Sequence, residues 1–471
     1  MGKFKIAVCI ILIILVSAIA YHFPRYDAYR GCLPWGASLA GIPAGGMEPE
    51  EAKHALEERF RAPFKLNYLD AGLTLSPEDI GFQVEADEML AEALEAREWI
   101  GFWRDFLAFL LHRPVATFEV PLRATYDEGK IKHLLSDMAS KHDQSLREPR
   151  AVEETLSFVP GQPGRCLDVE ASLPLVIEAL TSAEEREVDL VVEVIEPSSP
   201  SIDLLNGLLE KRLEEFPGIV GVFVKDLEGG EEMSINGDVA FSGMSTLKVA
   251  IVEEVFHRLD EPPDAEAAEL LTETMTLSGK NYVANQLLSL IGDGDARQGA
   301  RELTKSLNYL GLVNTFMGTP YDDKGPPPKI VTPANSRTDI NTNPDPYIQT
   351  TPKEVGLLLE MLYWCAKGGG TFIAAYPNQL EPCECQEMLS LMEANREGTL
   401  IEEGLPEGTR IAHKHGWIDD THADAAIVFS PGGDYVISVF VYRPEWLDLE
   451  ESTPLIADIS KAAYSYFNRG F

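Results

Sequence analysis

A serine and a lysine three positions apart, Ser245 and Lys248, have the residue types of a nucleophile and its base. If Ser245 opens a helix, the two side chains lie on one face, about one turn apart. A serine hydroxyl attacks only when a neighbouring base takes its proton, and a lysine in a partly dry pocket can have its pKa lowered enough to act as that base. The same spacing also fits a helix-capping serine followed by a solvated lysine, so the pair alone decides nothing.

Two later segments of the sequence favour the catalytic interpretation of Ser245 and Lys248. Ser278-Gly279-Lys280-Asn281 comes just before an apolar helical pattern, and Lys414-His415-Gly416-Trp417 lies in a strand-like stretch. In this order the segments resemble the motifs of class A β-lactamase-like serine hydrolases, within the penicillin-recognising superfamily. The signature of that family is Ser-x-x-Lys, then Ser-Asp-Asn, then Lys-Thr/Ser-Gly. The resemblance covers about residues 201–471.

The resemblance implies a role for each matching side chain. Ser245 would be the acylated nucleophile and Lys248 the base or proton relay. Ser278 or Asn281 would pass the proton to the leaving nitrogen and hold the substrate amide. Lys414 would hold the substrate carboxylate.

The third motif also implies backbone roles. The N–H groups of Ser245 and Trp417 would form the oxyanion hole, and Gly416 would leave room for substrate along the strand edge. His415 stands where the family has a hydroxyl residue. It can still donate a hydrogen bond to a carboxylate, with a charge that depends on pH.

The second motif and the long loop depart from the family pattern. Lys280 takes the aspartate position, and alignment on Asn281 and Asn285 puts Gly279 at the serine position, so Ser278 serves only if the loop shifts by one residue. Class A β-lactamases use a loop glutamate to activate the deacylating water. The loop 315–349 contains no glutamate, only shorter aspartates: Asp322, Asp323, Asp339 and Asp345.

Two hypotheses therefore stand. In the first, the chain is an active serine hydrolase that acylates Ser245 with a β-lactam or a cell-wall peptide amide and releases the acyl group slowly. In the second, it is a catalytically weak or inactive relative that binds wall polymer or a partner protein. No cofactor is expected in either case.

Metal binding is the competing interpretation of the histidines and cysteines. His413 and His415 share one face of a regular strand, but no carboxylate or cysteine at ligand spacing accompanies them. Strict alternation separates Lys414 from His415, and which of them lines the cleft stays open. Cys383 and Cys385 are a weak zinc signal without a second pair, whereas Cys32 and Cys166 could pair in an oxidising compartment.

The N-terminus predicts a membrane anchor or a cleaved signal. Lys3 and Lys5 precede an uncharged apolar run, Ile6–Tyr21, and Ala18-Ile19-Ala20 offers a cleavage pattern. Aromatic and basic residues after the run favour an uncleaved, single-pass anchor. Both interpretations place the rest of the chain outside the cytoplasmic membrane. The formal net charge of −37 argues against nucleic acid as a partner.

The pattern of elements predicts an α+β protein of three parts. Residues 1–25 form the anchor or signal, and residues 26–197 form a mixed α+β domain. A Pro- and Ser-rich linker at 196–200 then precedes a hydrolase domain, 198–471. In the latter, strands at both ends and helices between them indicate an antiparallel sheet flanked by helices, with a helical subdomain. Segments at 41–52 and 158–168 resemble peptidoglycan-binding modules found beside wall enzymes; a plain spacer is the alternative.

Overall fold

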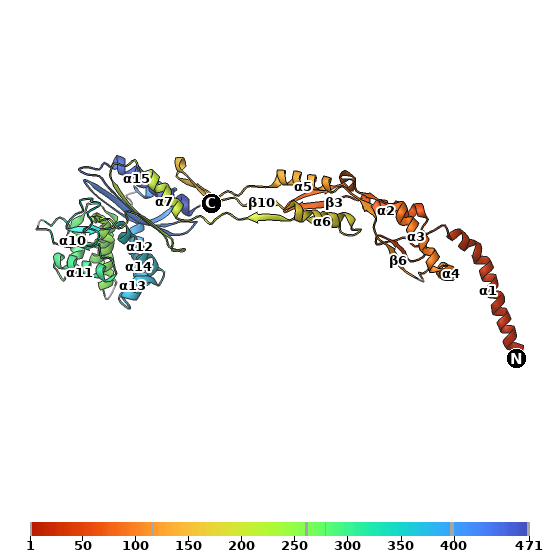
Figure 1. Cartoon of the computed structure of the whole chain (residues 1–471). Coiled ribbons are helices and arrows are strands. Elements are labelled where there is room, and N and C mark those ends of the chain that lie inside the picture. The colour runs from red at the N-terminus through yellow and green to blue at the C-terminus, as the bar shows by residue number, and fades with distance from the viewer. Residues whose placement is uncertain are drawn as a thin grey trace. The chain divides into compact units, whose positions relative to one another are not determined.

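The computed structural model describes residues 2–114, 116–259, 262–277, 279–323, 325–395 and 400–468, with side chains described from residue 10 onward and at Val8. The chain divides into two compact units (Figure 1). The first comprises Met1–Arg147 and Gln162–Pro197, and the second Glu148–Gly161 and Ser198–Phe471.

The first unit mixes short strands with helices, as the sequence predicts. Its helices are α1 (Gly2–Tyr29), α2 (Pro49–Arg61), α3 (Ala86–Ile100), α4 (Phe102–Leu111), α5 (Glu128–His142) and α6 (Val169–Thr181). Its strands are β1 (Ala37–Leu39), β2 (Ile42–Pro43), β3 (Phe64–Tyr68), β4 (Ala71–Leu75), β5 (Gln83–Val84), β6 (Phe118–Val120), β7 (Ala124–Thr125), β10 (Gly164–Leu167), β11 (Glu187–Asp189) and β12 (Val192–Ile195). They pair in the orders β2-β1-β6, β11-β3-β4, β5-β7 and β10-β12.

Helix α1 extends well past the apolar run that the sequence marks. It continues through Pro24 to Tyr29 as one helix. Its stretch Ile10–Tyr29 is long and apolar enough to cross a membrane, by length and composition only, and 6% of the most apolar window is buried.

The second unit is built on one antiparallel sheet. Its order is β14-β13-β20-β19-β18, formed by β13 (Ile219–Asp226), β14 (Glu232–Ile235), β18 (Arg410–Ile418), β19 (Thr421–Phe429) and β20 (Tyr435–Tyr442). All eight residues of the central strand β20 are buried, because helices cover both faces. A smaller sheet, β15-β17-β16, joins β15 (Phe241–Ser242), β16 (Phe316–Met317) and β17 (Ile348–Thr350).

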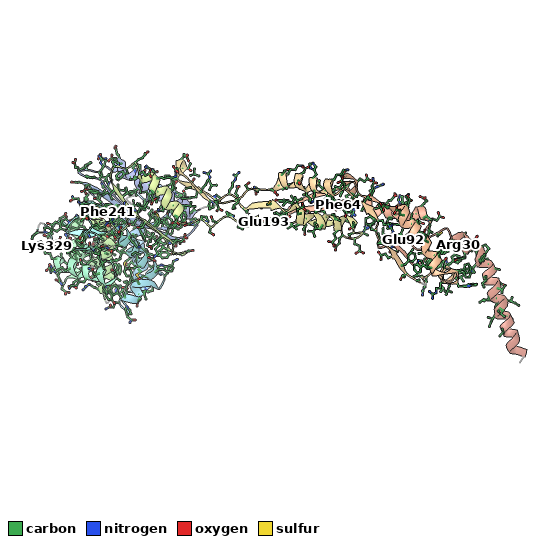
Figure 2. All side chains as sticks on the ribbon, in the orientation of Figure 1. Arg30, Phe64, Glu92, Glu193, Phe241 and Lys329 are labelled. Atoms are coloured by element: carbon green, nitrogen blue, oxygen red, sulfur yellow. A yellow bond between two sulfur atoms is a disulfide. The ribbon has the colours of Figure 1, made fainter. Side chains whose placement is uncertain are left out.

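Helices fall into two layers around this sheet. One face packs on α7 (Asp203–Leu213) and α15 (Leu449–Phe467). The other face packs on the helical subdomain: α8 (Lys248–Arg258), α9 (Ala265–Thr276), α10 (Asn281–Ile291), α11 (Ala296–Tyr309), α12 (Pro352–Ala366), α13 (Gly370–Ala375) and α14 (Pro382–Glu393). Each unit has its own core, and Figure 2 labels Phe64 and Phe241, one fully enclosed ring in each. The predicted α+β architecture is confirmed.

A hairpin from within the first-domain range packs with the second unit. Strands β8 (Arg150–Val152) and β9 (Ser157–Val159) form it. The ring of Phe158 meets that of Tyr466 on α15 edge-on, with centroids 5.6 Å apart. The sequence assigns residues 148–161 to the domain before the linker, because short strands carry no local sign of which core they join.

One disulfide closes part of the helical subdomain. Cys365 on α12 is bonded to Cys385 on α14, and both are fully buried. Cys32 and Cys166, the pair that the sequence left open, are free thiols, as is the exposed Cys383. The weak zinc signal at Cys383 and Cys385 therefore gains no support, because the sulfur of Cys385 is part of the disulfide.

We predict that removing this disulfide destabilises the second unit. For a sequence separation of 20 residues, the lost loop constraint corresponds to about 3 kcal/mol. In the double variant C365A/C385A the melting temperature should fall by roughly 6–12 °C, measured by differential scanning calorimetry. C383A is the matched control and should melt like the parent. A double variant that also melts like the parent would show that the bond adds nothing to stability.

Candidate active site

Ser245 lies in a tight turn directly before a helix. The 3-10 turn η3 (Met244–Leu247) leads into α8, which starts at Lys248. Side chains three residues apart line up in this geometry, so the turn sets Ser245 and Lys248 on one side. Ser245 is half-buried, whereas Lys248 is fully buried. The expectation that Ser245 opens a helix needs this adjustment: it sits in the turn that precedes the helix.

The turn is strained at Met244 and braced by the long loop. Met244 has φ +49°, a left-handed conformation that is uncommon for a residue with a side chain. The hydroxyl of Tyr321 donates to the Met244 carbonyl at 2.8 Å. The same ring lies 5.5 Å from Nζ of Lys248. Burial raises the pKa of Tyr321 far above its usual range, so the phenol stays protonated.

Strand β18 passes directly against this turn. A Cβ atom added to Gly416 would lie 2.7 Å from the Ser245 amide nitrogen and 2.9 Å from Cβ of Met244. Only glycine allows this approach. The exposed ring of Trp417, the next residue, lines one cavity with Ser245. The strand therefore brings the backbone of the third motif to Ser245.

That cavity has a volume of about 260 Å³. Its described lining comes from the turn, the start of α10, the loop and the end of β18: Met244, Ser245, Asn281, Thr319, Pro320, Tyr321, Asp322, Asp323, Asp345, Tyr347, Ile348, Trp417 and Ile418. Of the sequence-predicted site residues, Ser245, Asn281 and Trp417 meet here. Gly416 touches the turn from behind, and Lys414 and His415 are not in the lining.

Lys414 and His415 are both buried but face opposite sides of the sheet. Nζ of Lys414 donates to the Met275 carbonyl at the end of α9, at 3.1 Å. The neighbouring Ala412 belongs to the core on this helical side, whereas Ile411 belongs to the core beneath α7 and α15. Alternation along β18 therefore points Lys414 to the helical subdomain and His415 away from it.

The second motif is only partly in place. Nδ2 of Asn281 donates to Asp322 at 3.2 Å. Asn285 holds the loop from both ends of its amide: it donates to the Tyr321 carbonyl at 3.0 Å and accepts the Tyr321 N–H at 2.9 Å. Lys280 turns to Glu273 on α9, 3.1 Å away. Ser278 lies outside the described residues.

The acidic groups of the cavity differ in their partners. Asp323 accepts from Arg297 at 2.6 Å, and from the Gly325 N–H, and these bonds lower its pKa. Asp345 accepts the Tyr347 N–H at 2.7 Å, yet burial raises its pKa. Asp345 thus binds a proton more strongly than Asp323.

Behind β18 lies a buried histidine–carboxylate pair that the sequence reasoning did not identify. Nδ1 of His413 is 3.2 Å from both oxygens of Asp424, and both residues are buried. Burial disfavours the imidazolium, but the charge of Asp424 and its hydrogen bond outweigh this, and the pKa of His413 is raised. Nδ1 of His422 bonds Ser452 at 2.6 Å, and burial lowers the pKa of His422.

Helix α8 also carries two buried glutamates that the sequence reasoning missed. Glu254 pairs with Arg258, and its carboxylate lies 3.5 Å from His257. The carboxyl of Glu253 has no hydrogen-bond partner among the described atoms, and burial raises its pKa well above the usual range. The available signal was their position inside an otherwise apolar run, 249–256, every residue of which is buried.

Metal binding gains no geometric support. Within the described ranges, no group of three or more His, Cys, Asp or Glu side chains is placed to hold an ion. Nδ1 of His413 is engaged with Asp424 instead.

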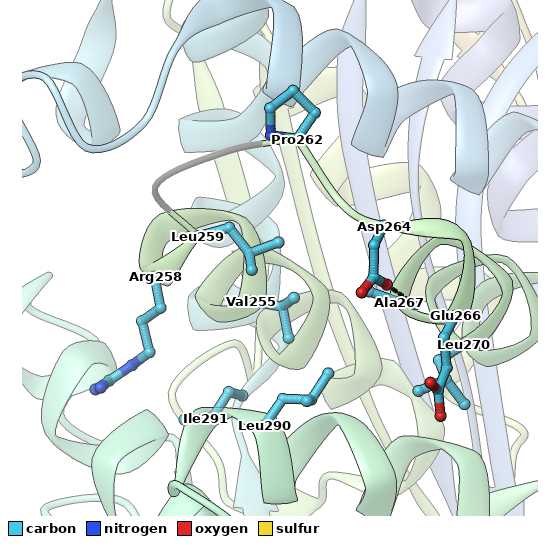
Figure 3. Close-up of a pocket in the computed structure, with 10 residues that line it drawn as sticks. All are labelled: Val255, Arg258, Leu259, Pro262, Asp264, Glu266, Ala267, Leu270, Leu290 and Ile291. Carbon is cyan, nitrogen blue, oxygen red and sulfur yellow. Dashed lines mark hydrogen bonds between the residues drawn. The ribbon is translucent and has the colours of Figure 1, made fainter.

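A second cavity lies away from the nucleophile, between α8, α9 and α10 (Figure 3). Its volume is about 570 Å³, and its walls are mainly apolar side chains such as Val255, Leu270 and Leu290. Asp264 at its rim is engaged in capping α9 through the Ala267 N–H, at 2.9 Å. Nothing in its lining has the chemistry of the cavity around Ser245.

Comparison with protein families gives two matches. Residues 205–263 and 260–467 match the model of the beta-lactamase enzyme family, which spans more than half of the chain. The protein belongs to that family. Residues 73–189 match a model described as "Putative peptidoglycan binding domain". The resemblances read from the sequence motifs are both confirmed at this level.

Solved structures similar to the chain include PBP-A, at 22% identity and a TM-score of 0.44, covering 58% of this chain and 99% of that one. A PBP-A mutant solved as an acyl-enzyme complex with penicillin G also has 22% identity and a TM-score of 0.44, with coverages of 58% and 100%. An ancestral (GNCA) class A β-lactamase has 22% identity, a TM-score of 0.42, and coverages of 55% and 98%. A comparison with curated proteins gave no significant match.

We predict that G416A impairs the site. The added methyl group meets backbone on the turn, which cannot rotate away, so the turn and strand must separate. The variant should lose about 1–3 kcal/mol of unfolding free energy, and any acylation of Ser245 should slow at least tenfold, on the order of the cost of misplacing reacting groups. G207A on α7, where nothing lies within 4 Å, is the control: it should gain roughly 0.5–1 kcal/mol of unfolding free energy, because alanine favours a helix over glycine, and leave acylation unchanged. Normal acylation in G416A would contradict the tight approach.

We predict that the His413–Asp424 pair makes stability depend on pH. Because the folded pKa of His413 is raised, its stabilising effect is complete below the unfolded value of 6.5 and is lost as pH rises through the folded value. The parent's melting temperature should therefore fall across that window in a titration from about pH 5.5 to 9. H413Q should flatten this slope, whereas H54Q, at an exposed histidine, should not. An unchanged slope in H413Q would refute the assignment.

Proposed function

We propose that this protein is an extracytoplasmic serine hydrolase that acylates Ser245 with a β-lactam or a cell-wall peptide amide and releases the acyl group slowly. One observation carries the proposal: a half-exposed serine on a strained turn lines a cavity, precedes a buried lysine by three residues, and touches the backbone of a glycine-containing strand. This is the arrangement that serine acylation requires.

Acylation would begin at Ser245. Its Oγ attacks the carbonyl carbon of the amide while its proton passes to Lys248, and a tetrahedral intermediate forms. The N–H groups of Ser245 and Trp417 stabilise the oxyanion. The C–N bond then breaks, and the proton returns to the leaving nitrogen. Ser278 remains a predicted relay for that proton.

The remaining site residues would act on the bound substrate. Asn281, at the cavity wall, is placed to donate to the substrate amide. Lys414 is buried on the helical side of β18 and would favour an anionic end of the substrate. His415 faces the other side of the sheet, so any effect of its side chain on the substrate would pass through the strand. Gly416 and Trp417 form the strand edge along which the substrate lies.

Deacylation is the weak step because the cavity offers no well-suited base. Tyr321 stands over Lys248 but keeps its proton. Asp323 is engaged with Arg297, and Asp322 accepts from Asn281. Asp345 is the remaining carboxylate in the lining, and its raised pKa makes it the best candidate for activating water.

The surroundings of the enzyme unit support its place outside the cytoplasm. A structural disulfide suits an oxidising compartment. Helix α1 fits a single-pass anchor. The match at residues 73–189 supports contact of the first unit with peptidoglycan. We infer a wall-facing enzyme held at the membrane.

A second candidate is a catalytically weak or inactive wall-binding relative. The observation that favours it is Lys280, which occupies the family's aspartate position and pairs with Glu273 rather than bracing the cavity.

We predict that a fluorescent penicillin labels the protein at Ser245. Intact-mass spectrometry should show one adduct in the parent and in S390A, which removes an exposed hydroxyl on α14, and none in S245A. The adduct should persist for hours because deacylation lacks a strong base. A folded parent without an adduct would favour the inactive relative. Rapid turnover of a chromogenic cephalosporin would contradict slow deacylation.

A further inference from the structure

Helix α4 is fastened to the end of α1. The ring of Tyr26 on α1 packs against Phe102, Phe106 and Phe109 of α4, with centroids 5.5, 5.1 and 5.6 Å away. The Tyr26 hydroxyl donates to the buried Asp105 at 2.8 Å. Nε of Arg97, on α3, lies 3.0 Å from the same carboxylate. A small aromatic core therefore joins the two helices, and the contacts of Asp105 with Tyr26 and Arg97 lie inside it.

The opposite face of α4 is apolar and uncovered. Trp103, Leu107, Leu110 and Leu111 follow the i, i+4, i+7, i+8 spacing of one helical stripe, and they are 70%, 47%, 37% and 56% exposed. Trp99, in the last turn of α3, adds another exposed ring at 62%. A contiguous surface of this kind marks an interaction site.

Charge and position select a lipid surface as the occupant. On α4 and the residues after it, up to Pro114, the exposed charges are Arg104 and Arg113, so this segment is locally basic in a chain of net charge −37, whereas Glu95 and Glu98 are exposed on α3 near Trp99. Basic side chains can meet lipid phosphates, and tryptophan favours the boundary between headgroups and acyl chains. The contacts of α4 with Phe23 and Tyr26 place it where the apolar part of α1 ends.

We propose that the exposed face of α4 lies in the headgroup region of the bilayer that α1 crosses, as a second, interfacial membrane contact. The proposal rests on the membrane location proposed above. It adds that the first unit contacts the membrane through α4 as well as through α1.

Tryptophan quenching by lipid tests this contact. The full chain is reconstituted in phosphatidylcholine vesicles whose acyl chains carry bromine near the headgroup. Fluorescence should be quenched in the parent and in W446F, which removes an exposed tryptophan of the second unit. In W99F/W103F most of the quenching should be lost.

The outcomes separate the two membrane claims. Protein that floats with the vesicles but shows the same quenching in W99F/W103F as in the parent overturns the role of α4 and leaves the anchor intact. Protein that does not float with the vesicles overturns both.

A second measurement excludes another copy of the chain as the occupant. In detergent, light scattering should report a monomer for the parent, for L107E/L111E and for the control L449E. A parental dimer that only L107E/L111E abolishes would overturn the lipid proposal in favour of self-association.

Discussion

The backbone of β18 at Gly416 runs so close to the turn that carries Ser245 that a single methyl group does not fit between them. The rest of the candidate site depends on this approach. It fixes the position of the third motif relative to the nucleophile. The central sheet holds the strand from one side, because β18 pairs with β19 along nine residues. The loop braces the turn from the other, through the Tyr321 hydroxyl and the Met244 carbonyl. Asn285 on α10 in turn fixes the backbone of Tyr321, so this side chain contributes to the geometry without itself lining the cavity.

Under the proposed function, the contact that supports the turn also limits deacylation. Tyr321 lines the cavity and supports the strained turn, so no carboxylate occupies its position. The loop therefore supports the turn that carries Ser245, and in the proposed reaction this would favour acylation over rapid hydrolysis of the acyl ester. Stabilising a strained turn from a neighbouring segment is a common way to keep a reactive group in place.

Much of the second unit could be predicted from its sequence. The apolar run 435–442, interrupted only by Ser438, predicts a strand with the bounds observed for β20, and the order of the three motifs gives the family. The face of Lys414 could not be settled in advance, because alternation fixes that two residues differ in direction but not which direction leads to the helical subdomain. The Cys365–Cys385 bond was equally hidden, since Cys383 lies two residues from the partner and only the packing of α12 on α14 selects between them.

The structure of the first unit was harder to predict from the sequence, for a related reason. Helix α4 follows α3 after Gly101 alone, and it carries apolar residues on a buried face and on an exposed face. Its partner is α1, far away in sequence, so no local window shows what covers one face. His413 and Asp424 likewise lie on two different strands, and the sequence gives no sign that they interact. Only the antiparallel pairing of β18 with β19 brings the two side chains within hydrogen-bond distance.

The β8–β9 hairpin changes how the protein can be divided. The polypeptide passes between the units at 147–148, at 161–162 and again at 197–198. A single protease cut at any one of these places gives two fragments that share a unit, so they separate only when the packing within that unit is lost. A fragment that begins at the linker would also lack Phe158 and its edge-on contact with the ring of Tyr466. An independently soluble enzyme fragment must therefore carry residues 148–161, so the natural boundary for engineering lies before the hairpin and not at the proline-rich linker.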